Sequence, residues 1–315
     1  MLSRRHLRIK VMQAVYAFSQ FENESIPAHE KELMKSIYKT EELFLYFLSS
    51  LLEIRHFAEK TLEEAKSKRL PTKEDLAPNL KFIQNKLLVY INKNESVKKA
   101  IASNGIEWSE YGDLMKKIYT NFKTSEAYTE YMSAPTSSFE EDREIVIRFY
   151  KSYIADEEML LHRFEELNIH WSDDWYFING YVLKYLKDVM PEHSPNRALP
   201  GLFKDEEDDL DFVKNLFRKT ITNTKEYQDL IVNQAKNWEE DRIAIMDFIL
   251  MKMAICELTE FPSIPVKVTL NEYIELSKNY STPKSKVFIN GILDKLVPAL
   301  KTEGKIKKVG RGLVE

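Results

Sequence analysis

Cysteine is almost absent from this sequence, and so are long apolar runs. Cys256 is the one cysteine in 315 residues, which excludes a disulfide or a thiolate zinc site within one chain. No apolar run approaches the roughly 18 residues that a membrane-spanning helix needs. Residues 1–21 are rich in arginine and poor in acids, as mitochondrial presequences are, but their apolar face suits core packing. We therefore expect a cytoplasmic protein.

Glycine is scarce too, with eight residues in the whole chain. The Gly-rich loops that hold nucleotide phosphates and the GxSxG motif of serine hydrolases are missing. His162 with Glu165 and Glu166, and a similar group at 170–174, could be drawn as acid–base or metal clusters. Such groupings arise by chance in a chain that is 30% charged. We expect no enzymatic activity, no cofactor and no metal.

What the sequence does contain favours helices. Long stretches rich in Leu, Lys and Glu take the place of the valine-rich alternation of strands. We predict an all-α fold, a helical bundle that is expanded by extra helices in the middle of the chain. One or two long helices are expected over 30–68 and, after a break at 71–78, several shorter ones over 79–132. Three prolines within 191–201 mark a segment boundary.

The N-terminal stretch predicts one helix over 3–21 with an unusual charge. Ser3 is placed to cap it, and apolar residues recur on one face at helical spacing: Leu7, Val11, Ala14, Val15 and Phe18. A second face carries Arg5, Arg8, Met12 and Tyr16, with Arg4 beside it. Cations near a helix N-terminus oppose its macrodipole and cost roughly 0.3–1 kcal/mol each when exposed. We infer that these arginines meet an anionic ligand.

The C-terminal part predicts three more helices. The first runs over 238–258, the second ends near Asn279, and the third begins at 281–283, where hydroxyl side chains precede a proline. The apolar stripe of the third helix consists of Ile289, Ile292, Leu293 and Leu296. Phe288 lies at the edge of this stripe, and Lys284 lies one turn before it.

Charge is distributed unevenly along the chain, although the net charge is only −4. Residues 205–211 are almost wholly acidic, and we interpret them as a solvated helix start that the helix dipole stabilises. The tail 301–315 is basic, and we expect it to be disordered. Local patches of this kind, and not the net charge, decide nucleic-acid binding.

One internal similarity is visible. Residues 142–171 align without gaps on residues 209–238, and the paired positions include Ile145 with Phe212 and Val146 with Val213. Asp174 then falls opposite Asp241. Two amphipathic helix pairs can be alike by chance, and a duplicated element of the bundle explains the pattern as well. Both interpretations remain open from the sequence.

Two groups of motifs stand at opposite ends of the chain. The N-terminal group is Arg4-Arg5-His6-Leu7-Arg8 followed by Gln13-Ala14-Val15-Tyr16. The C-terminal group is a Pro-x-x-Val-x-x-Asn-Glu pattern at 265–272 and Val-Phe-Ile-Asn-Gly-Ile-Leu-Asp at 287–294. In this order they resemble the NusB family of bacterial transcription antitermination factors. The resemblance covers 1–21 and about 205–300. It leaves 22–204 as a helical expansion and 301–315 as a tail.

The resemblance implies an all-helical protein that performs no chemistry. It implies binding of a boxA-like single-stranded RNA in ribosomal RNA leaders, together with NusE, a small-subunit ribosomal protein, in a transcription elongation complex. The alternative is a helical protein–protein scaffold that has lost specific RNA binding.

The resemblance and the chemistry of the side chains together select candidate site residues. Single-stranded RNA is held by cations on its phosphates and by aromatic rings under its bases. The RNA-binding candidates are Arg4, Arg5, Arg8, Tyr16, Lys284, Ser285, Lys286 and Phe288. Asp247 and Glu257 correspond to partner-facing positions of the family. On pattern alone, the arginines could equally be a solvated helix start, and Tyr16 and Phe288 could be core residues.

Overall fold

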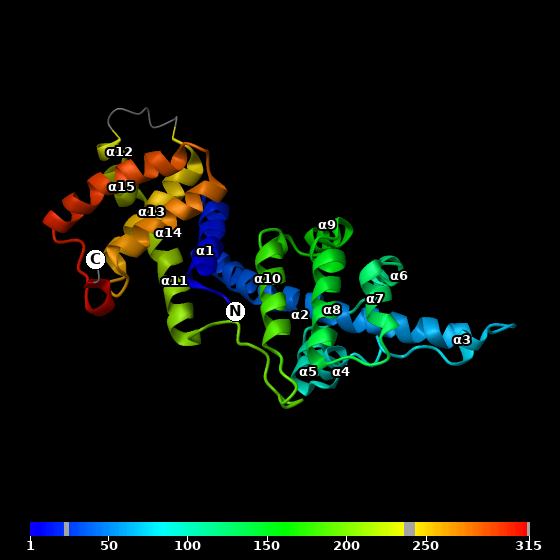
Figure 1. The fold of residues 1–315 in the computed structure, drawn as a ribbon. Coiled ribbons are helices and arrows are strands. Elements are labelled where there is room, and N and C mark those ends of the chain that lie inside the picture. The colour runs from blue at the N-terminus through cyan, green and yellow to red at the C-terminus, as the bar shows by residue number, and fades with distance from the viewer. Residues whose placement is uncertain (22–24, 236–242, 314–315) are drawn as a thin grey trace. The chain divides into compact units, whose positions relative to one another are not determined.

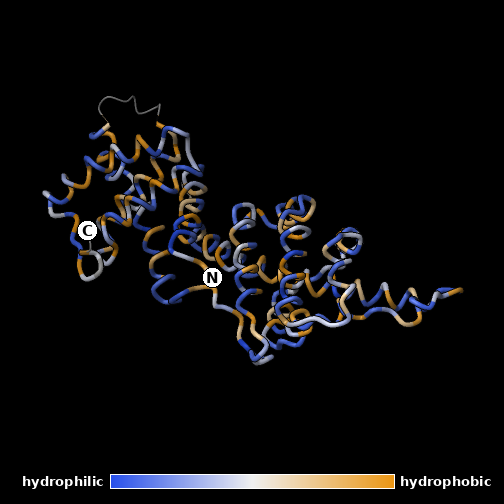
Figure 2. Tube along the Cα trace, in the orientation of Figure 1, coloured by the Kyte–Doolittle hydropathy of each residue, from blue (hydrophilic) through white to orange (hydrophobic). Residues whose placement is uncertain are grey.

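The computed structural model describes residues 1–21, 25–235 and 243–313, and every regular element within these ranges is a helix. The predicted all-α fold is confirmed. Figure 2 shows hydrophobic and hydrophilic residues alternating along the helices, as amphipathic helices in a bundle require. The chain forms two compact units: unit 1 is residues 1–37 and 202–315, and unit 2 is residues 38–201.

Helix α2 (Ile26–Lys66) is a single helix of 41 residues, where the sequence predicted one or two. The division between the units falls inside it, after Ile37. The second division, at 201/202, lies close to the predicted boundary at 204/205. The start of α2 is tied into unit 1 by an ion pair between Glu30 and Arg218.

Unit 1 is a bundle built around α1 and α13. Its elements, besides the start of α2, are α1 (Arg4–Ser19), α11 (Glu206–Thr222), α12 (Thr224–Gln234), α13 (Ile245–Glu260), α14 (Val266–Tyr280), α15 (Ser285–Thr302) and the 3₁₀ turn η5 (Gly310–Leu313). Helix α1 packs on α11 and α13, α13 packs on α14, and α14 packs on α15 (Figure 1). Segments from the two ends of the sequence therefore share one core.

Helix α1 forms as the sequence predicts. The Ser3 hydroxyl caps it by accepting a hydrogen bond from the backbone N–H of His6. The predicted apolar face is buried at Leu7, Val11 and Val15. Met12 is buried as well, although the sequence placed it on the face with the arginines. Two neighbouring faces of this helix are therefore covered by protein.

The last three helices differ from the predicted boundaries in two places. The predicted helix over 238–258 is wrong at its start: α13 begins at Ile245, because Ala244 before it has an extended backbone, and the predicted first residue Trp238 lies outside the described residues. Helix α15 begins at Ser285, later than predicted, and no side chain caps it. The Ser281 and Ser285 hydroxyls instead donate hydrogen bonds to the Asp247 carboxylate. These two hydroxyls therefore join α13 to the α14–α15 connection.

Unit 2 packs its shorter helices along the rest of α2. They are α3 (Lys73–Leu76), α4 (Lys86–Lys93), α5 (Glu95–Ser103), the 3₁₀ turn η1 (Ser109–Tyr111), α6 (Gly112–Lys123), α7 (Glu126–Ser133), α8 (Phe139–Phe149), the π-helix η2 (Tyr150–Ala155), α9 (Glu158–Leu167), the 3₁₀ turn η3 (Ile169–Trp171) and α10 (Trp175–Asp188). The core is aromatic: Phe47 meets Trp175 with ring centroids 4.7 Å apart, and Phe164 meets Trp171 at 5.7 Å.

The internal similarity has a counterpart in the helix boundaries. In the gapless alignment, residues 139–155 of α8 and η2 fall on residues 206–222, which are α11. Helix α9 likewise falls on α12, and Asp142 and Asp209 are both buried. The aligned Trp238 and Asp241 lie outside the described residues. A duplicated bundle element remains our proposal for this pattern.

The basic tail differs from the expectation of disorder. The Lys308 ammonium donates hydrogen bonds to the backbone carbonyls of Glu257 and Phe261, at 3.3 and 2.9 Å. The N–H of Val309 donates to the carbonyl of Pro262 at 3.0 Å. These contacts satisfy carbonyls at the end of α13, where a cation is favourable. Burial lowers the pKa of Lys308 to about 8.

We predict that Asp142→Ala destabilises unit 2. The Asp142 carboxylate accepts hydrogen bonds from Tyr131 Oη at 2.6 Å and the Lys86 N–H at 2.7 Å, and both donors would be left unpaired. The expected loss is about 2–4 kcal/mol in the free energy of unfolding. Urea unfolding followed by tryptophan fluorescence measures it, because Trp108, Trp171 and Trp175 lie in unit 2.

The control Glu140→Ala removes an exposed carboxylate and should cost under about 0.5 kcal/mol. Equal losses in the two variants would contradict the assigned role.

Candidate nucleic-acid interface

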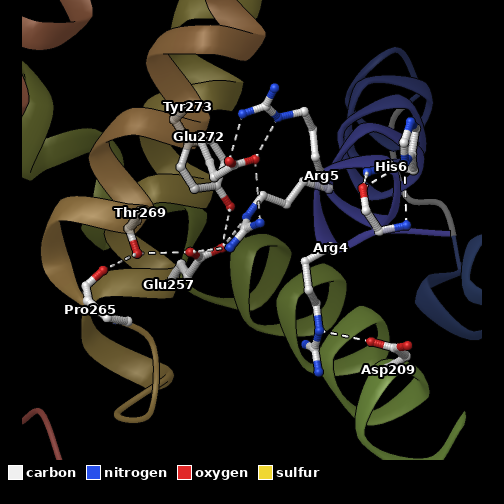
Figure 3. A network of polar contacts seen from close by, with 11 residues as sticks. Arg4, Arg5, His6, Asp209, Glu257, Pro265, Thr269, Glu272 and Tyr273 are labelled. Carbon is white, nitrogen blue, oxygen red and sulfur yellow. Dashed lines mark hydrogen bonds and ion pairs between the residues drawn. The ribbon is translucent and has the colours of Figure 1, made fainter. Parts of the chain in front are cut away.

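Arg8, the most buried of the arginine candidates, forms an ion pair with Glu257 between α1 and α13. Arg8 donates two hydrogen bonds of 2.7 Å to the two carboxylate oxygens of Glu257, and the two side chains are 3% and 0% exposed. Thr269 and Tyr273, both on α14, donate further hydrogen bonds to Glu257 at 2.8 and 3.2 Å (Figure 3). Burial alone would lower the pKa of Arg8, but the Glu257 carboxylate raises it above its ordinary value.

Arg5 forms a second, more exposed pair with α14. Its Nε and one terminal nitrogen donate to the Glu272 carboxylate at 2.9 and 2.8 Å. The Arg5 side chain is 48% exposed. Its hydrogen bonds, with the charge of Arg8 nearby, lower the pKa of Glu272. Glu272 therefore stays ionised and holds Arg5 at the edge of the network in Figure 3.

Arg4 points in the other direction, toward α11. Its Nε lies 2.8 Å from Asp209 Oδ1, and a terminal nitrogen also contacts Asp208. The guanidinium stacks over the Phe212 ring, 4.2 Å from its centroid. The sequence interpretation of 205–211 as a solvated helix start is therefore wrong at Asp209, whose side chain is only 6% exposed.

These contacts answer the question raised by the cations at the start of α1. The sequence led us to infer an anionic ligand, whereas the anions that the structure places against these arginines are carboxylates of α11, α13 and α14. The macrodipole cost is therefore offset inside the protein. Of the three arginines, Arg5 has the most exposed side chain.

Tyr16 lies further along α1 and is 41% exposed. It lines an open pocket of about 670 Å³, together with residues 244–246 before and at the start of α13 and residues 279–283 between α14 and α15. An exposed aromatic ring at the rim of a pocket is a suitable surface for stacking a flat ligand.

The candidates on α15 divide into exposed and buried residues. Lys284 and Lys286 directly follow the pocket wall and are exposed, and their ammonium groups form no ion pair within the described residues. Phe288 is half-buried. Ser285 is buried, and its hydroxyl donates to Asp247 at 2.9 Å.

The two candidate partner-binding acids are also inside the protein. Asp247 is 5% exposed and Glu257 is 0% exposed. Each carboxylate accepts hydrogen bonds from the same unit, Asp247 from serines and Glu257 from Arg8. Both acids therefore hold helices of unit 1 together in this structure.

Sequence reasoning missed the residues of α14 that take part in the network, Thr269, Glu272 and Tyr273. Glu272 lies in the quoted motif at 265–272, but nothing in the local pattern pairs it with Arg5. Thr269 and Tyr273 carry a usable signal, because residues four apart on α14 share one face. The structure brings Arg4, Arg5 and Arg8 into one network and places Tyr16 at the separate pocket.

Metal and membrane sites find no support in the part of the chain that the structure describes. In it, no group of three or more His, Cys, Asp or Glu side chains could hold a metal ion. The sequence grouping at His162 shows only a long contact to Glu165 at 3.9 Å, with the His162 side chain 82% exposed. Over the same residues, no helix combines the length and the apolar character needed to cross a membrane.

Comparison with known proteins bears on the same region. The model of the NusB family matches residues 182–298. The transcription antitermination protein NusB of Salinibacter ruber is 43% identical over 104 residues, which are 33% of this chain and 65% of that protein. The protein of the same name from Chloroherpeton thalassium is 43% identical over 105 residues, 33% of this chain and 50% of that protein. That from Listeria welshimeri is 34% identical over 107 residues, 34% of this chain and 82% of that protein. No solved structure gives a significant match.

The fold and the matched segment define an all-α bundle protein. The chain belongs to the NusB family, and the assignment made from the sequence motifs is confirmed. The chain spans 65% and 50% of the length of the first two relatives. The family match starts within α10 and ends within α15. Helix α1 lies outside the match, although it packs on α11 and α13, which are inside it.

We predict that Arg8→Ala destabilises unit 1 far more than Arg5→Ala. Removing Arg8 leaves the Glu257 carboxylate buried without a cation, which costs about 3–5 kcal/mol. Arg5→Ala removes an exposed pair and should cost under about 1 kcal/mol. Thermal and urea unfolding of both variants, monitored by circular dichroism, would compare them. Similar losses would show that the buried pair has no special weight.

The ring of His6 gives a prediction about pH. The Ser3 N–H donates to His6 Nδ1 at 3.3 Å, which requires an unprotonated nitrogen. Burial, followed by the charges of Arg5 and Lys10, lowers the pKa of His6 to about 4. The unfolded chain protonates near pH 6.5, so this contribution to stability is complete above pH 6.5 and is lost as the pH falls from about 6.5 to 4. An NMR titration of the His6 ring should give a midpoint near 4. A midpoint near 6.5 would contradict the assigned hydrogen bond.

Proposed function

We propose that this protein is a transcription antitermination factor that binds a boxA-like single-stranded RNA together with NusE, as part of a transcription elongation complex. Family membership supports the proposal, since the relatives above carry the name transcription antitermination protein. The observation that carries it is the exposed Tyr16 at a pocket whose wall continues into Lys284 and Lys286. The proposed function is binding alone and involves no catalytic step.

The chemistry of this surface suits unstacked RNA. Single-stranded RNA binds through aromatic rings that stack on bases and through cations that meet phosphates. Tyr16 supplies a ring beside the pocket, which has room for a base. Lys284 and Lys286 supply cations next to it, and the half-buried Phe288 lies one helical turn beyond Lys284.

The remaining candidates take supporting roles in this proposal. Arg8 fixes α1 against α13 and α14, and α1 carries Tyr16. Ser285 fixes the start of α15 through Asp247. Arg4 is held by the acids of α11, and Arg5 keeps an exposed edge that can reach a phosphate.

For the protein partner we propose NusE, which the family resemblance implies. The partner surface is then formed by residues other than Asp247 and Glu257, because these two are buried within unit 1. The competing proposal is a protein scaffold without specific RNA binding. The carboxylates that already engage Arg4, Arg5 and Arg8 favour this second candidate.

Fluorescence anisotropy with a short boxA-like RNA tests the proposal. The measurement is made with and without purified NusE, against a scrambled RNA at the same salt concentration. We expect sequence-selective binding that tightens with NusE. Tyr16→Ala should weaken it by about 5- to 150-fold, because stacking contributes about 1–3 kcal/mol per base. Lys284→Ala with Lys286→Ala should lower the slope of the salt dependence by about 0.7 for each phosphate that these lysines neutralise.

The matched control is Lys301→Ala, an exposed lysine at the opposite end of α15. It should leave the affinity unchanged. Weak, unselective binding that ignores NusE and all these substitutions would reject the RNA-binding proposal in favour of the scaffold.

A further inference from the structure

Two turns of unit 2 expose the most prominent apolar side chains of the described residues. Leu70 is 86% exposed, Ile169 is 80% exposed and Tyr176 is 79% exposed, more than any other large hydrophobic side chain described. Both turns lie outside the segment that matches the NusB family. Isolated exposed hydrophobic residues are ordinary, but clusters of them with charges around them mark interaction sites.

The first is the basic turn, residues 66–73, at the end of α2. It contains Lys66, Lys68, Arg69 and Lys73 and no acid. Thr72 and Asp75 form a capping box for α3, and Lys68 pairs with Asp75 at 3.0 Å. Within this turn the Leu70 side chain is 86% exposed, and Figure 2 shows hydrophobic colouring at the far end of α2. Lys66, Arg69 and Lys73 are exposed and form no ion pair within the described residues.

The second is the acidic turn, residues 165–176, which runs from the end of α9 to the start of α10. It contains no lysine or arginine. The Glu166 carboxylate lies 3.8 Å from Arg163, just before the turn, but its side chain is still 74% exposed, and Leu167 beside it is 50% exposed. Trp171 anchors the turn: it is 1% exposed, and its indole N–H donates to the carbonyl of Lys39 at 2.7 Å. With Trp171 filling the inside, Ile169 and Tyr176 are left on the outside.

We propose that the basic turn of one copy of this chain docks on the acidic turn of a second copy. The two surfaces have opposite charge, and each offers exposed apolar groups to the other. Within unit 2 the end of α2 lies well away from α9 in Figure 1, so the pairing joins different molecules. Each copy offers both turns, so two copies can form the contact twice in a two-fold dimer, or each copy can use its two turns on different neighbours and form rings or chains.

We expect the proposed contact between copies to be weak, because it is small and is formed largely by exposed charges. Two turns bury less surface than a stable interface requires, so the association is weak and transient. Exposed charges are screened by salt over about 10 Å at 0.1 M. Self-association therefore appears at high protein concentration and low salt. The inference is independent of RNA binding by unit 1.

Sedimentation velocity of the full chain tests the inference. The protein is compared from about 5 to 200 µM at low salt, and again at about 0.5 M salt. We expect the average mass to rise with concentration at low salt and to stay monomeric at high salt. A chain that is monomeric under all these conditions overturns the proposal.

Charge reversal identifies the surfaces. The triple variant Lys66→Glu, Arg69→Glu, Lys73→Glu and the double variant Glu165→Lys, Glu166→Lys should each weaken self-association at least about tenfold. Mixing the two variants should restore association, because the unchanged acidic turn of the first meets the unchanged basic turn of the second, and the two reversed turns also carry opposite charge. Leu70→Ser should weaken association without changing any charge. These side chains are exposed or at the surface, and circular dichroism checks the fold of each variant.

The matched control is Lys116→Glu with Lys123→Glu, two exposed lysines on α6, which should leave association unchanged. Association that persists in both reversed variants, or that fails to return in the mixture, overturns the pairing. Loss of binding to a generic single-stranded RNA by the basic-turn variant, in a chain that stays monomeric, would reassign that turn to phosphate binding.

Discussion

The arrangement of unit 1 depends on the pair between Arg8 and Glu257. These residues lie 249 positions apart in the sequence, and both are removed from water. Burying two charges carries a large desolvation penalty, which only good geometry and further hydrogen bonds can offset. The bidentate contact, with hydrogen bonds from Thr269 and Tyr273, provides both. The pair fixes α1 on α13 and α14, and it thereby sets where Tyr16 emerges.

The same network changes where positive charge is available. Arg4, Arg5 and Arg8 are engaged by Asp208, Asp209, Glu257 and Glu272, so the start of α1 carries little uncompensated charge. Lys284 and Lys286, at the start of α15, are exposed cations beside the pocket. In the function proposed above, the phosphates of the RNA would lie at α15 and a base would stack on Tyr16. The arginines would mainly hold the scaffold.

Unit 2 is held together by other contacts than unit 1. Its core is rich in aromatic rings, and a buried acid, Asp142, joins α4, α7 and α8 through hydrogen bonds. Asp209 has a related position at the start of α11, where it meets Arg4. If residues 142–171 and 209–238 arose by duplication, the two equivalent acids now differ in role: Asp142 joins helices in the core of unit 2, and Asp209 holds α1 through Arg4. The exposed turns through which we propose that copies associate lie in unit 2, outside the family match.

The sequence by itself determined the helical class, the Ser3 cap, the buried apolar face of α1 and the membership in the NusB family. Each of these depends on residues a few positions apart or on motifs read in order. Only the tertiary structure decided that Arg8, Ser285, Asp247 and Glu257 are buried, and that the basic tail packs on the end of α13. The physical reason is that a charge finds its partner through long-range packing. A periodic pattern shows that a helix has a polar face, but it does not show which carboxylate, some 200 or more residues away, will cover it.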